Sequence, residues 1–275
     1  MNKIRLLKSS DVPQLHELSR QAGWNQTPQD WERTLALTPD GCFGIEQNGG
    51  IVSSTTTIVY GNELAWIGMV LTLPEFRGQG FASLLLDYAI RHVRGSVQWI
   101  KLDATEQGRP IYAGFGFQDE CPIERWKRRA GRGPKPDASG LVHRYVVDPS
   151  FDRAYFGSYR VPLLNALLKQ EAGYIMGYGY AMGRPGERAT YFGPCVVRTR
   201  DAARQLVEWF VSQHHSEDIY WDLFPDNKDA VQLAIDYGFE PDRHLMRMAL
   251  PTAPGIPPLV RNNASVFAIA GFEYG

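Results

Sequence analysis

The segment Trp66–Arg94, WIGMVLTLPEFRGQGFASLLLDYAIRHVR, predicts a buried strand, a glycine-containing turn and a helix in that order. The apolar run Trp66–Leu71 is typical of a buried strand. After the turn, apolar side chains recur with the i, i+3, i+4, i+7 spacing of one helix face, at Phe81, Leu84, Leu85 and Tyr88. We therefore expect the rest of the fold to be organised around this strand, turn and helix.

The turn Arg77-Gly78-Gln79-Gly80 has the composition of an anion-binding loop. Its two glycines allow the backbone to approach a ligand closely and to adopt φ values that other residues avoid. Its amides also open a helix, whose positive dipole end favours a negative charge. With Arg77 adding a fixed positive charge, the turn predicts a site for a polyphosphate such as a pyrophosphate.

The composition argues against several other classes of protein. The chain has 275 residues, enough for one large or two ordinary domains, and its net charge of −1 gives no reason to expect nucleic acid or an anionic membrane as partner. No segment resembles a signal peptide or reaches the ~20 apolar residues that cross a bilayer, so we expect a soluble cytoplasmic protein. The three cysteines, Cys42, Cys121 and Cys195, lie far apart in the sequence and form no CxxC motif. This spacing favours buried free thiols over disulfides or a zinc site.

Two short helices precede the first long strands. The second begins after Thr27, where Pro28 and Asp30 complete the pattern of a capping box. The loop Trp24-Asn25-Gln26 between the helices offers an aromatic ring and two amides as a recognition surface. The alternative is a Trp that only fills the junction of the two helices.

The chain up to residue 130 predicts an α/β fold with a mixed sheet. Hairpin turns join an antiparallel meander with strands at Cys42–Gln47, Ile51–Tyr60 and Leu64–Leu71. A helical crossover then places the strand Val97–Asp103 parallel to the last of these. A short helix from Pro110, ended by Gly116-Phe117, leads to a further strand at Ile123–Lys127.

The second half repeats this order in a weaker form. Thr190–Val197 resembles the strand before the turn, and a helix, a strand and a helix follow at Asp201–Val211, Ile219–Phe224 and Asn227–Tyr237. The turn itself is replaced by Arg198-Thr199-Arg200-Asp201, without glycine, and Asp201 would cap the helix. We expect a ligand-binding domain over residues 1–130, a linker over 131–145, and a second domain over 146–275 that does not bind the same ligand.

These motifs resemble the GNAT superfamily of acetyl-coenzyme A-dependent N-acetyltransferases. Arg77-x-x-Gly80-x-Ala82 after an apolar strand matches the pyrophosphate loop of that family, and Tyr112 followed by Gly116-Phe117 matches its Tyr-x-x-x-Gly-Phe helix. The second half is similar to the degenerate repeat of tandem GNAT proteins. The resemblance implies two GNAT-like domains, each with a central mixed sheet whose strands splay apart and whose faces carry helices.

The resemblance also implies a set of site residues. Groups of the splayed strand and the turn would bind acetyl-coenzyme A, at Met69, Val70, Leu71, Arg77, Gly78, Gln79, Gly80, Phe81, Ala82 and Ser83. Tyr112 would protonate the leaving thiolate when a neutral amine attacks the thioester directly in a ternary complex. The acceptor would be a small-molecule amine, with candidate lining residues Trp24, Asn25, Gln26, Asp103, Trp221 and Asp222.

Other assignments stay open. Asp103, Glu106 and Glu63 are candidate general bases, and bound water is an alternative to all three. His214-His215 favours a helix-end role over a metal site, and we expect no metal. The tail Val266–Phe272 predicts a buried strand. We expect a monomer or a homodimer.

The main rival hypothesis is a non-catalytic acyl-coenzyme A sensor or partner-binding module. It differs from an enzyme in binding the cofactor without transferring its acyl group. A dinucleotide-binding enzyme fits less well, because its fingerprint needs a third glycine and a βαβ unit, whereas the strands before the turn form an antiparallel meander.

Overall fold

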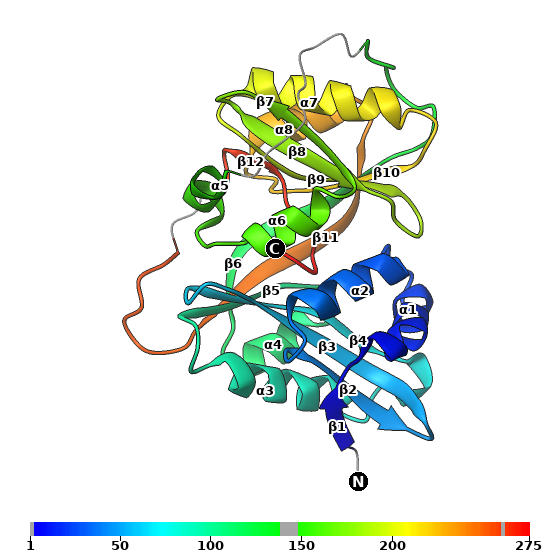
Figure 1. The fold of residues 1–275 in the computed structure, drawn as a ribbon, viewed down its shortest axis with the longest axis vertical. Coiled ribbons are helices and arrows are strands. Elements are labelled where there is room, and N and C mark those ends of the chain that lie inside the picture. The colour runs from blue at the N-terminus through cyan, green and yellow to red at the C-terminus, as the bar shows by residue number, and fades with distance from the viewer. Residues whose placement is uncertain (1–2, 138–147, 260–261) are drawn as a thin grey trace.

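The computed structural model describes residues 3–137, 148–259 and 262–275 and shows two lobes that share one sheet (Figure 1). The sheet contains both antiparallel and parallel pairs, and helices flank it in each lobe. This confirms the predicted mixed α/β class. In the described part of the chain, none of the helices has the length and apolar character needed to span a lipid bilayer.

The N-terminal half follows the order of elements that the sequence predicts. Its helices and strands are β1 (Lys3–Leu6), α1 (Val12–Gln21), α2 (Pro28–Leu37), β2 (Cys42–Gln47), β3 (Gly50–Tyr60), β4 (Leu64–Thr72), α3 (Phe81–Val93), β5 (Trp99–Ala104), α4 (Arg109–Gly114) and β6 (Gln118–Arg128). Thr27 caps α2, and its backbone N–H donates to the Asp30 carboxylate at 2.9 Å, as a capping box requires.

The C-terminal half repeats the strand–helix–strand–helix–strand order of the first. Its elements are α5 (Pro149–Phe156), α6 (Val161–Leu167), β7 (Glu171–Ile175), β8 (Gly179–Arg184), β9 (Thr190–Val197), α7 (Arg200–Gln213), β10 (Ile219–Leu223), α8 (Lys228–Asp236), β11 (Glu240–Pro251) and β12 (Val266–Ala268). Of the predicted linker 131–145, residues 131–137 contain no helix or strand, and the remainder lies outside the described residues.

The two halves exchange their last long strands. The sheet order is β1-β2-β3-β4-β5-β11-β6-β10-β9-β8-β7. Strand β11 of the second half therefore pairs with β5 of the first, and β6 of the first half pairs with β10 of the second. The two exchanged strands also pair with each other and pass from lobe to lobe in Figure 1. A division of the chain near residue 130 thus follows the sequence repeat but not the arrangement in space.

Helix α3 packs on the sheet with a face that differs in part from the predicted one. Phe81 and Leu85 are buried as expected, but Leu84 and Tyr88 are 39% and 43% exposed. The prediction for these two side chains was wrong because the helix turns its next residues toward the sheet. The buried face continues through Leu86, Ala89, Ile90 and Val93.

The tail forms a shorter strand than predicted. Only Val266–Ala268 belongs to β12, and the following residues leave the sheet and run between the lobes (Figure 1). There the Trp66 indole N–H donates to the Phe272 carbonyl at 2.9 Å, and the Tyr60 hydroxyl donates to the Tyr274 carbonyl at 2.9 Å. The tail is therefore fixed against the N-terminal lobe, where it becomes part of the site described next.

Candidate active site

The turn before α3 is open to solvent and has unpaired amides at the start of the helix. Gly78 and Gly80 have φ values of +77° and +78°, which favour glycine, and a Cβ at either position would have no atom within 4 Å. Gly80 is the N-cap of α3 but provides no side-chain capping bond. An anion of pyrophosphate size therefore fits the turn, because it can accept the hydrogen bonds that no side chain accepts.

Arg77 lies beside these amides. Its Nε donates to the Thr72 carbonyl at 3.2 Å, which holds the guanidinium near the last residue of β4. Gln79 is exposed, and Phe81 is buried under α3. Ala82 and Ser83 line the same groove as the two glycines. These predicted cofactor-binding residues are thus brought together at one end of the groove.

Strand β4 contains a bulge at the predicted cofactor-binding residues. Two residues of β4, Met69 and Val70, lie opposite the single residue Thr55 of β3, and Met69 has a φ of +49° although it is not glycine. The bulge reverses the direction of the side chains: Ala65 and Ile67 pack under α3, whereas Met69 and Leu71 pack under α1 and α2. Such a conformation in a buried residue is costly and is typical of functional sites.

The bulge is held by serines of β3. Ser54 Oγ donates to the Met69 carbonyl at 2.9 Å, and Ser53 Oγ donates to the Leu71 carbonyl at 2.8 Å. The Met69 and Leu71 side chains are buried, as expected for core residues. Val70, between them, is only partly buried and lines the groove.

Strands β4 and β5 splay apart after Trp66, just before the bulge, as the resemblance implied. Their parallel pairing runs from Leu64–Trp99 to Trp66–Lys101 and then stops, although both strands continue. A cavity of about 120 Å³ lies where they separate. Residues of both strands line it, among them Ile67, Val70 and Leu102.

The cavity and the groove are continuous. They share five lining residues, Trp24, Val70, Thr105, Tyr112 and Arg243. A molecule bound along the groove from the glycine turn would therefore reach the cavity at Tyr112. A second, smaller molecule in the cavity would meet it there, which is the arrangement that a group-transfer reaction needs.

Tyr112 projects from α4 to this junction. Its ring lies edge-on to Phe117, with centroids 6.2 Å apart, and within the described ranges its hydroxyl has no hydrogen-bond partner. Burial raises the pKa of Tyr112 to about 12. The phenol therefore keeps its proton at neutral pH and has its hydroxyl available for a ligand.

The three residues of the Trp24-Asn25-Gln26 loop differ in whether they line the cavity. Trp24 and Gln26 line the cavity. Asn25 does not: its Oδ1 accepts from the backbone N–H groups of Arg188 and Ala189 at 2.9 and 3.0 Å, and its Nδ2 donates to the Ala189 carbonyl. These three hydrogen bonds join Asn25 to the second lobe.

Asp103 lines the cavity but is already paired. Arg247 donates to both of its carboxylate oxygens, at 2.8 and 3.0 Å. Burial raises the pKa of Asp103, and the charge of Arg247 opposes that rise. The other candidate bases lie elsewhere: Glu106 is exposed, and Glu63 forms an ion pair with Arg153.

Trp221 and Asp222 do not line the cavity. Trp221 is fully buried in the core of the second lobe, where its indole N–H donates to the Phe267 carbonyl at 2.7 Å. Asp222 accepts two hydrogen bonds of 2.7 Å from Arg125, and it is Arg125 that lines the cavity. Both residues were candidates for the lining of the acceptor site, but β11 and β6 lie between β10 and β5 in the sheet, so β10 does not reach the opening.

Sequence reasoning missed five residues that close the cavity. These come from the exchanged strands and the tail and comprise Arg125, Arg243, Leu245, Phe272 and Glu273. The tail approaches β4 so closely that a Cβ on Gly68 would lie 3.0 Å from the Glu273 carbonyl oxygen. A glycine at position 68 is therefore a sign in the sequence that another segment packs closely on β4. It does not show that this segment is the C-terminal tail.

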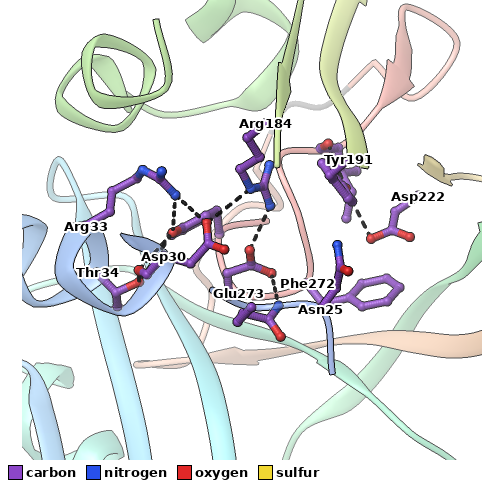
Figure 2. Close-up of polar contacts among 12 residues, drawn as sticks. Asn25, Asp30, Arg33, Thr34, Arg184, Tyr191, Asp222, Phe272 and Glu273 are labelled. Atoms are coloured by element: carbon purple, nitrogen blue, oxygen red, sulfur yellow. Dashed lines mark hydrogen bonds and ion pairs between the residues drawn. The ribbon is translucent and has the colours of Figure 1, made fainter. Parts of the chain in front are cut away.

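Glu273 belongs to a buried network of charges between the lobes (Figure 2). Arg184 lies between Asp30 and Glu273, at 3.3 and 2.8 Å, and Arg33 also pairs with Asp30. Gln26 Nε2 donates to Glu273 at 3.0 Å. Burial raises the pKa of Glu273, while the charge of Arg184 opposes it. Two carboxylates and two guanidiniums thus balance one another and hold the tail in place.

The second copy of the turn does not offer the same site. Helix α7 is capped by Thr199, whose Oγ1 accepts from the Ala202 N–H at 3.2 Å. The prediction that Asp201 is the cap was wrong by two residues, because the helix begins at Arg200 and Asp201 lies in its first turn. A side chain of the chain itself therefore satisfies this helix start.

Each half matches a family model. The model described as the acetyltransferase (GNAT) family matches residues 10–117, and the one described as an acetyltransferase (GNAT) domain matches residues 149–261. No curated protein sequence matches the chain significantly.

Solved structures share the arrangement of both lobes. A candidate acetyltransferase from Pyrococcus horikoshii is 20% identical with a TM-score of 0.86, covering 99% of this chain and 95% of that one. The tandem GNAT protein of the clavulanic acid biosynthesis pathway is 14% identical with a TM-score of 0.67, covering 93% and 100%. A GCN5-related N-acetyltransferase from Sphaerobacter thermophilus is 13% identical with a TM-score of 0.64, covering 92% and 96%. At these identities the likeness shows a common fold.

Proposed function

Because both halves of the chain belong to the GNAT acetyltransferase family, we propose that it is an N-acetyltransferase that acts on the primary amine of a small molecule. The family uses an acyl-coenzyme A donor, and we propose acetyl-coenzyme A as the donor here. The observation that carries the proposal is the continuity of groove and cavity at Tyr112. Donor and acceptor would then bind together, and the acceptor would attack directly.

The groove fits the donor along its length. The amides of Gly78 to Ser83, with Arg77 beside them, would hold the pyrophosphate. The bulged segment Met69–Leu71 would position the pantetheine between the splayed strands. When bound, the donor supplies an acetyl thioester at the junction. Since the turn of the second half is capped and lacks glycine, we propose one donor site in each chain.

Tyr112 is the proposed general acid. As the C–N bond forms, the amine nitrogen loses a proton, and as the C–S bond breaks, the sulfur needs one. The Tyr112 hydroxyl, which keeps its proton because burial raises its pKa to about 12, would donate to the sulfur.

No unpaired carboxylate among the described residues that line the cavity is available to accept the proton from the amine. Asp103 and Glu273 are the carboxylates that line the cavity in the described part of the chain, and each is bound by an arginine. We therefore propose that water accepts this proton. All of the cavity's lining comes from one chain, so a monomer would be competent, whether or not the protein forms a homodimer.

The test is a panel of primary amines with acetyl-coenzyme A, read by release of free thiol. We expect turnover with at least one amine and a rise in melting temperature on adding the donor. Tyr112→Phe should lower kcat by about 100-fold or more, the range typical of a lost general acid, and should retain donor binding. Tyr237→Phe is the matched control, because Tyr237 is bonded to Glu208 in the second lobe.

Two results would contradict the proposal. Absence of any thermal shift with acetyl-coenzyme A would show that the groove does not bind the donor. A wild type that binds the donor but acetylates no amine would favour the sensor hypothesis. Equal activity of Tyr112→Phe and wild type would remove Tyr112 from the mechanism while leaving the reaction in place.

A further inference from the structure

The cavity contains one charge that the protein does not balance. Four charged side chains line it in the part of the chain that the structure describes: Asp103, Arg125, Arg243 and Glu273. Three of them have a buried partner of opposite charge, at distances of 2.7 to 2.8 Å. The Arg243 guanidinium forms no ion pair or hydrogen bond with any described residue, so its positive charge stays unbalanced once the other three charges are matched with their partners.

The surroundings of Arg243 make this charge unfavourable in the absence of a ligand. Burial, and then the neighbouring charge of Arg125, lower the pKa of the Arg243 guanidinium. Arg125 cannot turn away, because Asp222 binds it through two hydrogen bonds and its guanidinium lies over the ring of Phe272, 4.6 Å from the centroid. An anion placed in the cavity would supply the counter-charge that the protein omits.

Arg243 is also close to the place of reaction. It lies at a bulge of β11, where the pairing with β6 shifts register between Pro241 and Arg243. Like Tyr112, it lines both the cavity and the groove. An anionic group bound to Arg243 must therefore lie near the atom that attacks the thioester, not at the far end of a long acceptor.

A second unpaired group lines the same cavity. Gln26 Oε1 is buried without a hydrogen-bond partner in the described residues, although Gln26 Nε2 is bonded to Glu273. A carbonyl oxygen accepts hydrogen bonds and suits an amine N–H. The cavity thus combines an unpaired cation with an unpaired acceptor.

We propose that the acceptor is a small α-amino acid, whose carboxylate binds Arg243 and whose amine faces Gln26 and the thioester. This inference rests on the proposed function and names its substrate class. A guanidinium binds a carboxylate through two parallel hydrogen bonds, which fixes the orientation of the neighbouring amine. The cavity volume of about 120 Å³ and its lining of Ile67, Leu102, Leu245 and Phe272 suit a small or medium apolar side chain.

The test compares amino acids with the amines that lack only the carboxylate: alanine with ethylamine, leucine with isopentylamine, and phenylalanine with phenethylamine. In the wild type, kcat/KM should favour the amino acid at least about 10-fold in one or more pairs, as expected for a charged hydrogen bond. Arg243→Met should remove this preference by raising KM for the amino acid far more than for the simple amine. Arg243→Lys should restore part of it.

The control is Arg94→Met, which removes the same charge at an exposed position. Arg94 follows the last residue of α3, about 20 Å from the glycine turn at 1.5 Å per residue. This variant should match the wild type with every acceptor.

A binding measurement separates this inference from the proposed function. The same pairs are titrated by calorimetry into protein saturated with free coenzyme A, so that no turnover is required. Tighter binding of the amino acid, lost in Arg243→Met, supports the inference even if no acceptor is acetylated. Equal or better binding of the simple amines would overturn it. So would an Arg243→Met variant that keeps the preference but binds coenzyme A more weakly, since Arg243 would then serve the donor.

Discussion

The two lobes contain the same splayed pair of parallel strands, but only the first pair is open. In the first lobe, β4 and β5 part after Trp66, and the cavity lies between them. In the second, β9 and β10 part after Phe192, and β12 occupies the space. There the Ile269 N–H donates to the Asp222 carbonyl at 3.0 Å. The backbone groups that a ligand would use are bonded to the chain itself.

The helix starts differ in the same way. Gly80 leaves the first amides of α3 without a side-chain partner, whereas Thr199 caps α7. The second copy is therefore closed at both places where a donor would bind, the splayed strands and the turn. The segment that closes it continues into Phe272 and Glu273, which wall the cavity of the first lobe. The same segment therefore closes the second pair of strands and completes the cavity beside the first.

Removing residues 262–275 should reduce stability and activity more than any other change. It would take away β12, which lies between β9 and β10, and the residues Phe272 and Glu273, which line the cavity of the first lobe. Phe267 lies fully within the core of the second lobe, and the charges of Arg184 and Asp30 would lose Glu273. Since loss of one buried Phe costs about 3–5 kcal/mol, we expect the shortened chain to be insoluble or molten. Near-UV circular dichroism and expression in the soluble fraction measure this.

The point variant Phe267→Ala serves as the milder comparison. It should fold with a melting temperature lowered by roughly 10 °C, given about 2–4 °C per kcal/mol in a chain of this size. A soluble and active protein ending at residue 261 would show that β12 is dispensable.

Gly80→Asp should abolish donor binding while Thr199→Asp should not. Aspartate tolerates a positive φ better than most residues, and nothing lies within 4 Å of the Gly80 Cβ position, so the fold should survive. Its carboxylate would repel the pyrophosphate by up to about 4 kcal/mol at 4 Å, and we expect affinity for acetyl-coenzyme A to fall at least about 100-fold. Calorimetric titration measures it.

Thr199→Asp is the matched control, because aspartate also caps helices and adds the same charge at the other turn. If both variants bound the donor with equal affinity, the difference between the two turns would have no functional meaning.

Thr199→Ala should produce a smaller change that affects only stability. The lost cap should cost about 1 kcal/mol of unfolding free energy, or a few degrees of melting temperature. Donor affinity should stay the same if, as proposed, the donor binds only at the first turn. Chemical denaturation and the same titration check both parts, and a change in affinity would contradict the assignment of the site to the first lobe.

The smallest effect should be that of pH on kcat, through the ionisation of Tyr112 in the first lobe. Because burial raises the pKa of Tyr112 to about 12, kcat should not fall between pH 8 and pH 10. The folded-state pKa is above the unfolded value, so the stability that this group contributes is present below about pH 10 and is lost as pH rises toward about 12. A decline in kcat with an apparent pKa below 10 that disappears in Tyr112→Phe would contradict this.

Local patterns predicted the elements and the open glycine turn well. The alternating strands, the capping box at Thr27 and the glycines of the turn depend on neighbours within a few residues. The resemblance to the family motif indicated Tyr112, and the position of α4 directly after β5 is in keeping with that. The repeat also predicted the order of elements in the second lobe.

The acceptor cavity could not be predicted in the same way. Arg125 and Arg243 reach it because β6 and β11 exchange places, and Phe272 and Glu273 reach it because the tail leaves the sheet after Ala268. The contacts that hold them join residues far apart in the sequence, 144 positions for Asp103 with Arg247 and 97 for Arg125 with Asp222, and no local periodicity encodes them. Trp221 and Asp222 were misplaced for the same reason, since the repeat alone does not show the exchange.

The strand exchange also sets the order in which the site can form during synthesis. Strand β5 lacks its neighbour β11, and the cavity lacks Glu273, until residues 240–275 have been translated. Because domains fold as the chain emerges at about 5–20 residues per second, the donor turn can form long before the acceptor wall exists. A nascent or truncated chain would therefore bind the donor without directing it to an amine, and transfer would begin only when the molecule is complete.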